Sequence, residues 1–390
     1  MKKENGITLI ALIVTIIIML ILAGISVRLA LDNNGVIDNA REAKDQYEQS
    51  MYDDEEGMYY LSEGLRRGLE SRNDRYEPEK VYEKATIPEG YYYVGGTEAK
   101  GLVISDNVAD KEKYKNQEDV GKDLEGNQWV WVPVQDISLC ITVEDDKAIE
   151  LTGGTGVKTT RYSRKVLGEW RGNPGSTDFR EPDLITGENG EKYDYLSINC
   201  GHAGFSNSKN MAETLVNEYD EMIRSVEKYK GFYIGRYELS EEGEKAASVL
   251  TYKSWYELYK SCTTLANGEN VKSRMIWGAQ WDATCAWLID SGFSVTDSSS
   301  WGNYSDNTAK DHGYKHSTGY SEVWKANNIY DFAGNYLECT QEAFSTIFRV
   351  CRGGEAYQSG AEYPALNSKN GEYPHNTNDE ATRPMLYIIP

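Results

Sequence analysis

One uncharged stretch near the start of the chain limits where the remainder can fold. Residues 7–27 read ITLIALIVTIIIMLILAGISV and contain no charged side chain. A helix rises about 1.5 Å per residue, so a stretch of this length covers the ~30 Å hydrocarbon core of a bilayer. Lys2 and Lys3 precede it, and basic residues stay on the cytoplasmic side of a membrane. The sequence therefore predicts a single-pass membrane helix over residues 7–31, with the following domain outside the cell.

The leader before this helix has a recognisable form. Residues 1–6 contain two lysines and end in Gly6, directly before Ile7. This arrangement resembles the prepilin-type signal of bacterial type IV pilins and pseudopilins, in which a membrane peptidase cuts after the glycine. The resemblance implies processing between Gly6 and Ile7 and a place in the bacterial cytoplasmic membrane. Pilins usually carry Glu at the fifth mature position, where this chain has Ala11, so filament assembly is in doubt; a plain uncleaved anchor is the alternative.

The amino-acid composition limits which classes of partner the exported domain is expected to bind. Asp and Glu number 62 against 41 Lys and Arg, which gives a formal charge of −21. Phosphate backbones would repel so acidic a chain, so nucleic acid is not expected as a partner. The 29 tyrosines and 9 tryptophans supply aromatic surface for a folded core. The 6 cysteines contain no C-x-x-C pair, and the sequence does not decide between buried thiols and disulfides.

Periodicity divides the rest of the chain. Apolar residues at three- and four-residue steps predict a stalk helix over residues 36–70, followed by a linker over residues 71–84. Residues 85–390 mix short aromatic or β-branched runs with helical patterns, which predicts an α+β domain. A Gly- and acid-rich segment at about 135–210 is expected to be a surface insertion. Within the domain we expect strands near residues 91–94, 102–104, 128–134 and 232–238, and helices near residues 211–226, 255–262 and 277–288.

Four sequence blocks suggest which α+β domain this is. They are GFYIGRYE (231–238), SRMIWGAQWDATCAWL (273–288), NIYDFAGNYLECTQE (328–342) and FRVCRGG (348–354). Read in this order, they resemble the formylglycine-generating-enzyme/sulfatase-modifying domain, a variant of the C-type lectin fold. The resemblance covers roughly residues 87–389. It implies short antiparallel strands, a few helices and much loop.

The chemistry of that family is not expected here. Its oxidase members hold copper with two cysteines a few residues beyond Gly-Gly; counted from Gly353-Gly354, those places hold Gln358 and Tyr363, which cannot act as thiolate ligands. We therefore expect no enzyme and no cofactor. The fold admits structural Ca²⁺ bound by Asp and Asn oxygens, but no EF-hand-like spacing supports one. The histidines are scattered rather than spaced as metal ligands, at His202, His312, His316 and His375.

A polar tail offers a binding surface instead. Residues 355–382 are rich in Tyr, Asn and Glu and are interrupted by Gly and Pro, so we expect them to lie outside the core. Tyrosine provides rigid contact area and amides provide adaptable hydrogen bonds, as in antibody paratopes. The alternative is a surface loop without a partner. The predicted ligand-binding residues are Glu355, Tyr357, Gln358, Glu362, Tyr363, Asn367, Lys369, Asn370, Glu372, Tyr373, His375, Asn376 and Asn378.

The order of these parts suggests a function. An Arg-Gly-Gly strand, a tyrosine-rich tail and a final Arg-Pro-x-Leu-Tyr-Ile strand (383–388) resemble variable proteins diversified by retroelements. The resemblance implies that residues after Gly-Gly vary on a fixed backbone and bind proteins or other cell-surface ligands. Our leading interpretation is an exported, membrane-anchored, non-enzymatic protein that binds a protein or glycan ligand. The alternatives are a minor pilin or pseudopilin, whose partners would be pilin-like subunits of a secretion or adhesion filament, and a formylglycine-generating-type oxidase.

Overall fold

The computed structural model describes most of the predicted domain. The predicted leader (1–6), membrane helix (7–31) and stalk helix (36–70) lie outside the described residues, as does most of the linker (71–84). Among the described residues, no helix combines the length and the apolar character needed to cross a membrane. The structure describes residues 82–150, 156–164, 200–206, 208–266, 270–345, 348–372, 374 and 377–390.

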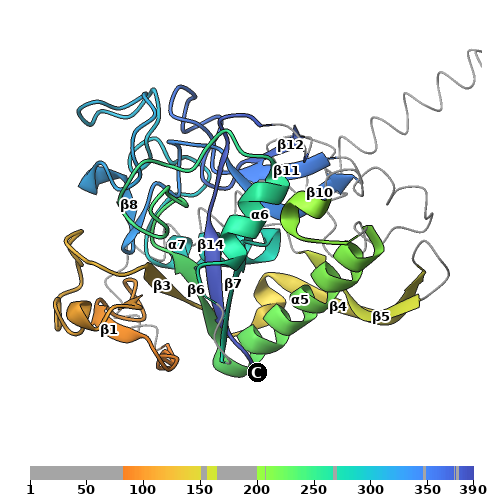
Figure 1. Cartoon of the computed structure of the whole chain (residues 1–390). Helices are drawn as coiled ribbons and strands as arrows, with labels where there is room; N and C mark the ends of the chain where they lie inside the picture. The colour runs from red at the N-terminus through yellow and green to blue at the C-terminus, as the bar shows by residue number, and fades with distance from the viewer. Residues whose placement is uncertain are drawn as a thin grey trace, which may run out of the picture. The chain divides into compact units, whose positions relative to one another are not determined.

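A six-stranded antiparallel sheet organises these residues. The C-terminal strand β14 lies between β6 and β7, with Met385 opposite Ile234 and Leu386 opposite Ser273 (Figure 1). Strand β14 is therefore an internal strand of this sheet, next to the edge strand β7. In spatial order the strands are β1 (Tyr92–Gly95), β2 (Val103–Ser105), β3 (Gln128–Pro133), β6 (Gly231–Gly235), β14 (Pro384–Ile388) and β7 (Val271–Met275).

A second sheet carries the segment that follows Gly-Gly. Strand β10 pairs antiparallel with β11 and parallel with β13, and β11 pairs antiparallel with β12. The order is β12 (Ser368–Glu372), β11 (Phe348–Arg352), β10 (Glu338–Ser345) and β13 (Ala381–Thr382). Two further pairs are β4 (Ile141–Glu150) with β5 (Gly156–Arg164) and β8 (Lys325–Ala326) with β9 (Ile329–Tyr330). Cys140 and Ile141, within the expected insertion, are buried in the core.

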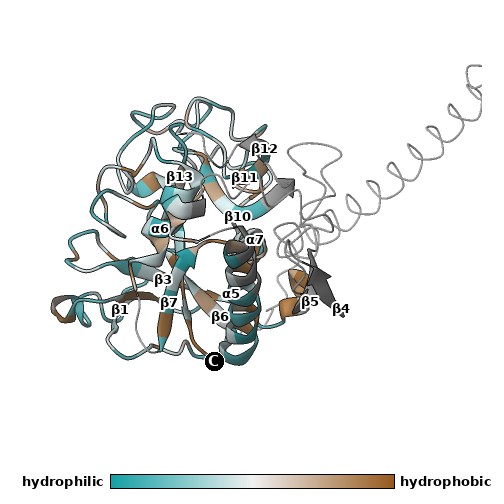
Figure 2. Ribbon diagram, turned by 45° about the vertical axis from the view of Figure 1, so that its right-hand side comes forward, coloured by the Kyte–Doolittle hydropathy of each residue, from teal (hydrophilic) through white to brown (hydrophobic). Residues whose placement is uncertain are grey.

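Among the described residues, three α-helices pack on these sheets: α5 (Ser208–Tyr229), α6 (Trp255–Thr263) and α7 (Gly278–Asp290). Helix α5 follows the predicted apolar pattern, since Leu215, Tyr219 and Met222 are buried, while its outer side is hydrophilic (Figure 2). Helix α6 begins with a capping box in which Ser254 and Glu257 satisfy each other's backbone N–H groups. Short 3₁₀ turns are η1 (Val108–Asp110), η2 (Ile137–Leu139), η3 (Cys200–Ala203) and η4 (Glu322–Trp324). The described domain is thus mixed α and β, with antiparallel sheets and few helices.

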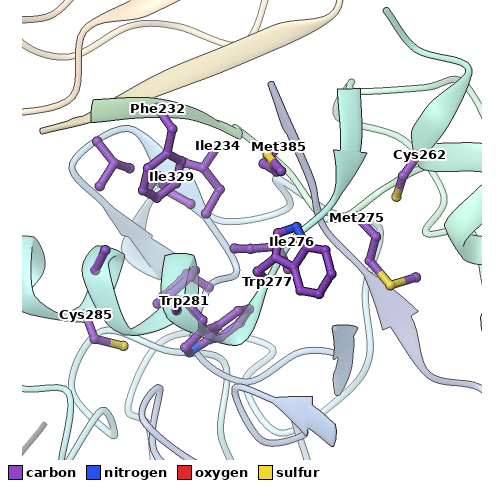
Figure 3. Close-up of a cluster of buried hydrophobic side chains, with 14 of the residues drawn as sticks. Phe232, Ile234, Cys262, Met275, Ile276, Trp277, Trp281, Cys285, Ile329 and Met385 are labelled. Carbon is purple, nitrogen blue, oxygen red and sulfur yellow. The ribbon is translucent and has the colours of Figure 1, made fainter. Parts of the chain in front are cut away.

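Tryptophans dominate the core between the central sheet and α7. Figure 3 shows Trp277 and Trp281 within this cluster, together with Met275 and Met385. Trp281 stacks on Phe332 with ring centroids 4.1 Å apart, and its Nε1 donates to the backbone oxygen of Ala365 at 2.8 Å. The same side chain therefore fills the core and holds the segment that connects β11 to β12 in the second sheet.

Candidate binding surface

A buried polar turn joins the four sequence blocks. Residues 331–335 form the expected tight turn, with positive φ at Asp331 (55°), Gly334 (77°) and Asn335 (62°). Asn335 Nδ2 donates to Glu238 Oε2 at 2.6 Å, and Asn335 Oδ1 accepts the backbone N–H of His316 at 2.9 Å. The turn at residues 331–335 is therefore hydrogen-bonded to Glu238, at the end of the first sequence block, and to His316, in a loop outside the four blocks.

Buried charges surround this turn. Arg383 pairs with both carboxylate oxygens of Glu338, at 2.7 and 3.0 Å, and donates to the backbone oxygen of Tyr330 at 2.9 Å. Burial raises the pKa of Glu338 to about 7, although Arg383 acts in the opposite direction. Burial, together with the neighbouring carboxylates of Asp331 and Glu338, raises the pKa of Glu238 well above its ordinary value. Arg383 thus joins the residue before β14 to Glu338 of β10 and to Tyr330 of β9.

The chain after Gly-Gly is held through its backbone. Gly353 and Gly354 have φ of 90° and 73°, and a Cβ on Gly354 would lie 2.2 Å from the backbone oxygen of Tyr363. The Tyr304 hydroxyl donates to the backbone oxygen of Gly353. Ala365 N–H donates to Ser298 Oγ at 3.0 Å. Other parts of the fold therefore fix both ends of residues 353–365.

A second set of contacts fixes the middle of this loop. Asp306 accepts from Gly360 N–H at 2.9 Å and from Ser359 Oγ at 2.7 Å. The backbone N–H of Ser305 donates to the backbone oxygen of Gln358 at 2.9 Å. Burial acts to raise the pKa of Asp306, but these hydrogen bonds to the charged form outweigh it and the pKa is lowered. The loop is therefore a set of turns pinned to residues 298–306.

Lys315 contacts three other loop segments, which contain Tyr336, Glu355 with Tyr357, and Asp379. Its Nζ lies 3.0 Å from Glu355 Oε1 and 2.6 Å from Asp379 Oδ2. The same ammonium lies 4.9 Å from the ring centroid of Tyr336 and 5.6 Å from that of Tyr357. Burial acts to lower the pKa of Lys315, but the hydrogen bonds to the two carboxylates raise it above its ordinary value. Lys315 therefore stays charged and clamps the loops at their centre.

Several of the predicted residues are exposed on these loops. Tyr357 is 62% exposed and donates its hydroxyl to Glu355, and Tyr363 is 38% exposed. Burial of the hydroxyl, with the hydrogen bond to Glu355, raises the pKa of Tyr357 to about 12. Glu362 and Lys369 are exposed, and Gln358 and Asn378 are half-buried.

The expectation that the whole tail lies outside the core is wrong. Glu355 is buried under Lys315, and Asn367 is buried where the chain turns inward toward Trp281 and enters β12. Pro364, Ala365 and Leu366 are buried with them. Asn370 and Glu372 lie within β12, and the remaining predicted residues lie outside the described part of the chain, at Tyr373, His375, Asn376, Gly6 and Ile7.

Sequence reasoning missed part of the surface. Tyr314 is 72% exposed, next to Lys315. Tyr320 is 49% exposed and stacks on His316 with centroids 4.1 Å apart, while its hydroxyl donates to Asp311 Oδ2 at 2.8 Å. The Gly- and Tyr-rich composition of residues 302–320 was the available signal. Within the described ranges, no three His, Cys, Asp or Glu side chains form a group that could hold a metal ion.

The positions aligned with the copper cysteines have other contacts. Gln358 Oε1 accepts the backbone N–H of Glu355 at 3.0 Å, which closes a small turn, and Tyr363 lies at the surface. Two cysteines do come together elsewhere: Cys339 and Cys351 are opposite each other on β10 and β11, with sulfur atoms 2.6 Å apart. Their spacing in the sequence gave no sign of this contact.

Comparison with known proteins adds little to this description. No family model matches the chain, and no curated protein matches it. Among solved structures, variable protein 1 of Treponema denticola is similar at 12% sequence identity, covering 70% of this chain and 98% of the other, with a TM-score of 0.24. A TM-score this low carries no argument about fold or function. The class that the described residues define is therefore a mixed α and β domain with a tyrosine-bearing loop surface.

Proposed function

We propose that this chain is an exported, membrane-anchored binding protein whose C-type-lectin-like head captures a protein or glycan ligand through its C-terminal loops. The observation that carries the proposal is a difference between the backbone and the side chains of residues 353–367. Their backbone is hydrogen-bonded to other segments, whereas the side chains of Tyr357, Glu362 and Tyr363 are exposed. A fixed backbone with exposed tyrosines suits ligand capture.

Preorganisation is the physical basis of this proposal. Binding costs free energy whenever loops and side chains become ordered in the complex. Here Asp306, Ser298 and Tyr304 hold the loop backbone, and Lys315 contacts both Tyr357 and Glu355. Most of the free-energy cost of ordering the loop is therefore incurred during folding and not during binding. The exposed tyrosine rings can then add contact area without a further ordering of the backbone.

The proposed function is non-catalytic and needs no cofactor. Gln358 and Tyr363 stand at the places of the copper cysteines, and Gln358 is occupied in a turn with Glu355. The leader and membrane helix would hold the head at the outer side of the cytoplasmic membrane. Diversification of Tyr357, Glu362 and Tyr363 in related copies of the gene belongs to the same proposal, because their backbone is held independently of the exposed side chains.

Arrays of glycans and of cell-surface proteins test this function. The full-length chain, purified in detergent, is compared with the Tyr357→Ala/Tyr363→Ala variant and with Val108→Ala. Val108 is a matched control because it is 62% exposed, as Tyr357 is, and lies on η1 rather than on the loops. We expect wild type and Val108→Ala to capture the same ligand and the double variant to lose it. Equal capture by all three would show that the binding surface lies elsewhere.

A further inference from the structure

The pairing of β10 with β11 places two cysteines in direct contact. Cys339 and Cys351 are register partners in the antiparallel ladder, and both are buried. Their sulfur atoms lie 2.6 Å apart, against about 2.05 Å in a formed disulfide. Directly opposed residues of such a ladder have Cβ atoms about 4.5–5.5 Å apart, close to the ~3.5–4.5 Å that a disulfide spans. Little backbone movement is needed to join them.

The two strands are held in this register by other bonds. Thr340 Oγ1 donates to the backbone oxygen of Val350 at 3.0 Å, across the same pair of strands. Thr382 Oγ1 donates to the backbone oxygen of Cys339 at 2.7 Å, from the neighbouring strand β13. The contact between the sulfur atoms therefore does not depend on one flexible side chain. It is built into the sheet.

We propose that Cys339 and Cys351 form a cross-strand disulfide in the mature protein. Two thiols lose two protons and two electrons as the S–S bond forms, and a disulfide-bearing oxidant such as oxidised glutathione accepts the electrons and becomes two thiols. One cysteine thiolate attacks the oxidant and expels its first thiol. The second cysteine thiolate attacks the mixed disulfide and expels the other. Because both cysteines are buried in the folded sheet, the exchange takes place while β10 and β11 are still open.

The cross-link has a consequence for the loops. Cys351 lies two residues before Gly353, so the disulfide fixes β11 immediately before the chain enters residues 353–367. The residues immediately before the loop at 353–367 are then covalently linked to β10, which also pairs with β13. An exported head meets an oxidising environment, where such bonds persist. The cross-link stands whether or not the loops bind a ligand, so its test is separate from the arrays.

Peptide mapping tests the proposal. The full-length chain is extracted in detergent without added oxidant or reductant, its free thiols are blocked with N-ethylmaleimide in denaturant, and it is digested with trypsin without reduction. Cleavage after Lys325, Arg349 and Arg352 releases residues 326–349 and residues 350–352. We expect these two peptides to be joined and two hydrogen masses lighter than the free pair. Reduction should separate them.

Variants and a stability measurement make the result decisive. Cys285→Ala removes a different buried thiol and should keep the linked peptide, whereas Cys339→Ala should leave Cys351 labelled. Breaking the bond should lower the Tm by about 5 °C in wild type and leave the Cys339→Ala/Cys351→Ala variant unchanged. The proposal is overturned if both cysteines carry the blocking group, if either is linked to another cysteine, or if they remain thiols that retain copper.

Discussion

Asp331 provides a sharp test of the buried charges beneath the loops. Its side chain is 2% exposed, and Oδ2 accepts from Gly319 N–H at 2.6 Å and from Thr318 Oγ1 at 3.1 Å. Within the described part of the chain, Oδ1 is buried without a hydrogen-bond partner. Burial raises the pKa of Asp331 from 3.8 to about 6, despite these hydrogen bonds to the charged form. The folded protein therefore binds this proton more tightly than the unfolded chain does.

The sign of the pH dependence follows from that difference. A carboxyl whose folded pKa is raised makes the fold less stable as pH rises, because ionisation is harder in the folded state. This loss of folding stability is nearly absent below pH 3.8 and nearly complete above about pH 6. One pKa unit corresponds to about 1.4 kcal/mol, so the whole penalty is about 3 kcal/mol. Between pH 4.5 and 7.5, Asp331 should lower the free energy of unfolding by about 2 kcal/mol.

Asp331→Asn removes the charge while preserving the shape. Asparagine tolerates the positive φ of 55° at this position, and its oxygen can accept the same two hydrogen bonds. The amide NH2 group of the asparagine takes the place of Oδ1 and has no hydrogen-bond acceptor there. This lowers the free energy of unfolding by about 1–2 kcal/mol at every pH. At pH 7.5 this loss is offset by the absent charge penalty. The variant should therefore be about 1–2 kcal/mol more stable than wild type at pH 7.5, and equal to wild type or up to about 1 kcal/mol less stable at pH 4.5.

Urea unfolding of the full-length chain in detergent, followed by tryptophan fluorescence at pH 4.5, 6 and 7.5, measures this difference. Asp306→Asn is the control, because hydrogen bonds lower the pKa of Asp306 against its partial burial. Its carboxylate stabilises the fold at neutral pH, and that stabilisation fades as the pH falls toward the folded pKa. That loss lies below pH 3.8, outside the measured range, so Asp306→Asn should leave the pH dependence between pH 4.5 and 7.5 as in wild type, whereas Asp331→Asn should remove part of it. An Asp331→Asn variant with the same pH dependence as wild type would refute the reasoning.

Three further substitutions test other parts of the structure. Tyr357→Ala/Tyr363→Ala should abolish ligand capture on the arrays while shifting the Tm by less than about 2 °C, because Tyr357 is 62% exposed and Tyr363 is 38% exposed. Gly354→Ala should cost about 2 kcal/mol or more in urea unfolding, since it combines φ of 73° with a clash against the backbone oxygen of Tyr363. Arg383→Met should cost about 3–5 kcal/mol in the same assay at pH 8, because it leaves Glu338 buried without its partner, and the loss should shrink at pH 5 as that carboxyl is protonated.

Local patterns predicted the elements that depend on near neighbours in sequence. Helix α5 follows from apolar residues at helical spacing, and β3 follows from an aromatic and β-branched run. The turn at residues 331–335 follows from Gly334 and from asparagine and aspartate residues that accept positive φ. Each of these outcomes is decided within a few residues. They are the part of the fold that a single sequence can specify.

Contacts between distant segments were not predictable in this way. Lys315 meets Glu355 and Asp379 from segments 40 and 64 residues away. Cys339 meets Cys351 only because β10 and β11 adopt one particular register, and a shift by one residue would place the sulfur atoms on opposite faces. Trp281 meets the backbone of Ala365, which lies 84 residues further along the chain. Sequence composition marked residues 355–382 as unusually polar, but it did not separate their buried residues from their exposed ones.

The contacts of the loop also rank its positions by how freely they can change. Gln358 uses its side chain to accept from Glu355 N–H, and Glu355 uses its own to hold Lys315, so substitution at either residue removes part of the scaffold. Glu362 is held through its backbone N–H, which donates to the backbone oxygen of Ser359 at 3.2 Å, and its side chain is exposed. Backbone hydrogen bonds survive a change of side chain. A library that randomises Glu362 and Tyr363 should therefore keep its folded fraction, whereas randomising Glu355 should lower it.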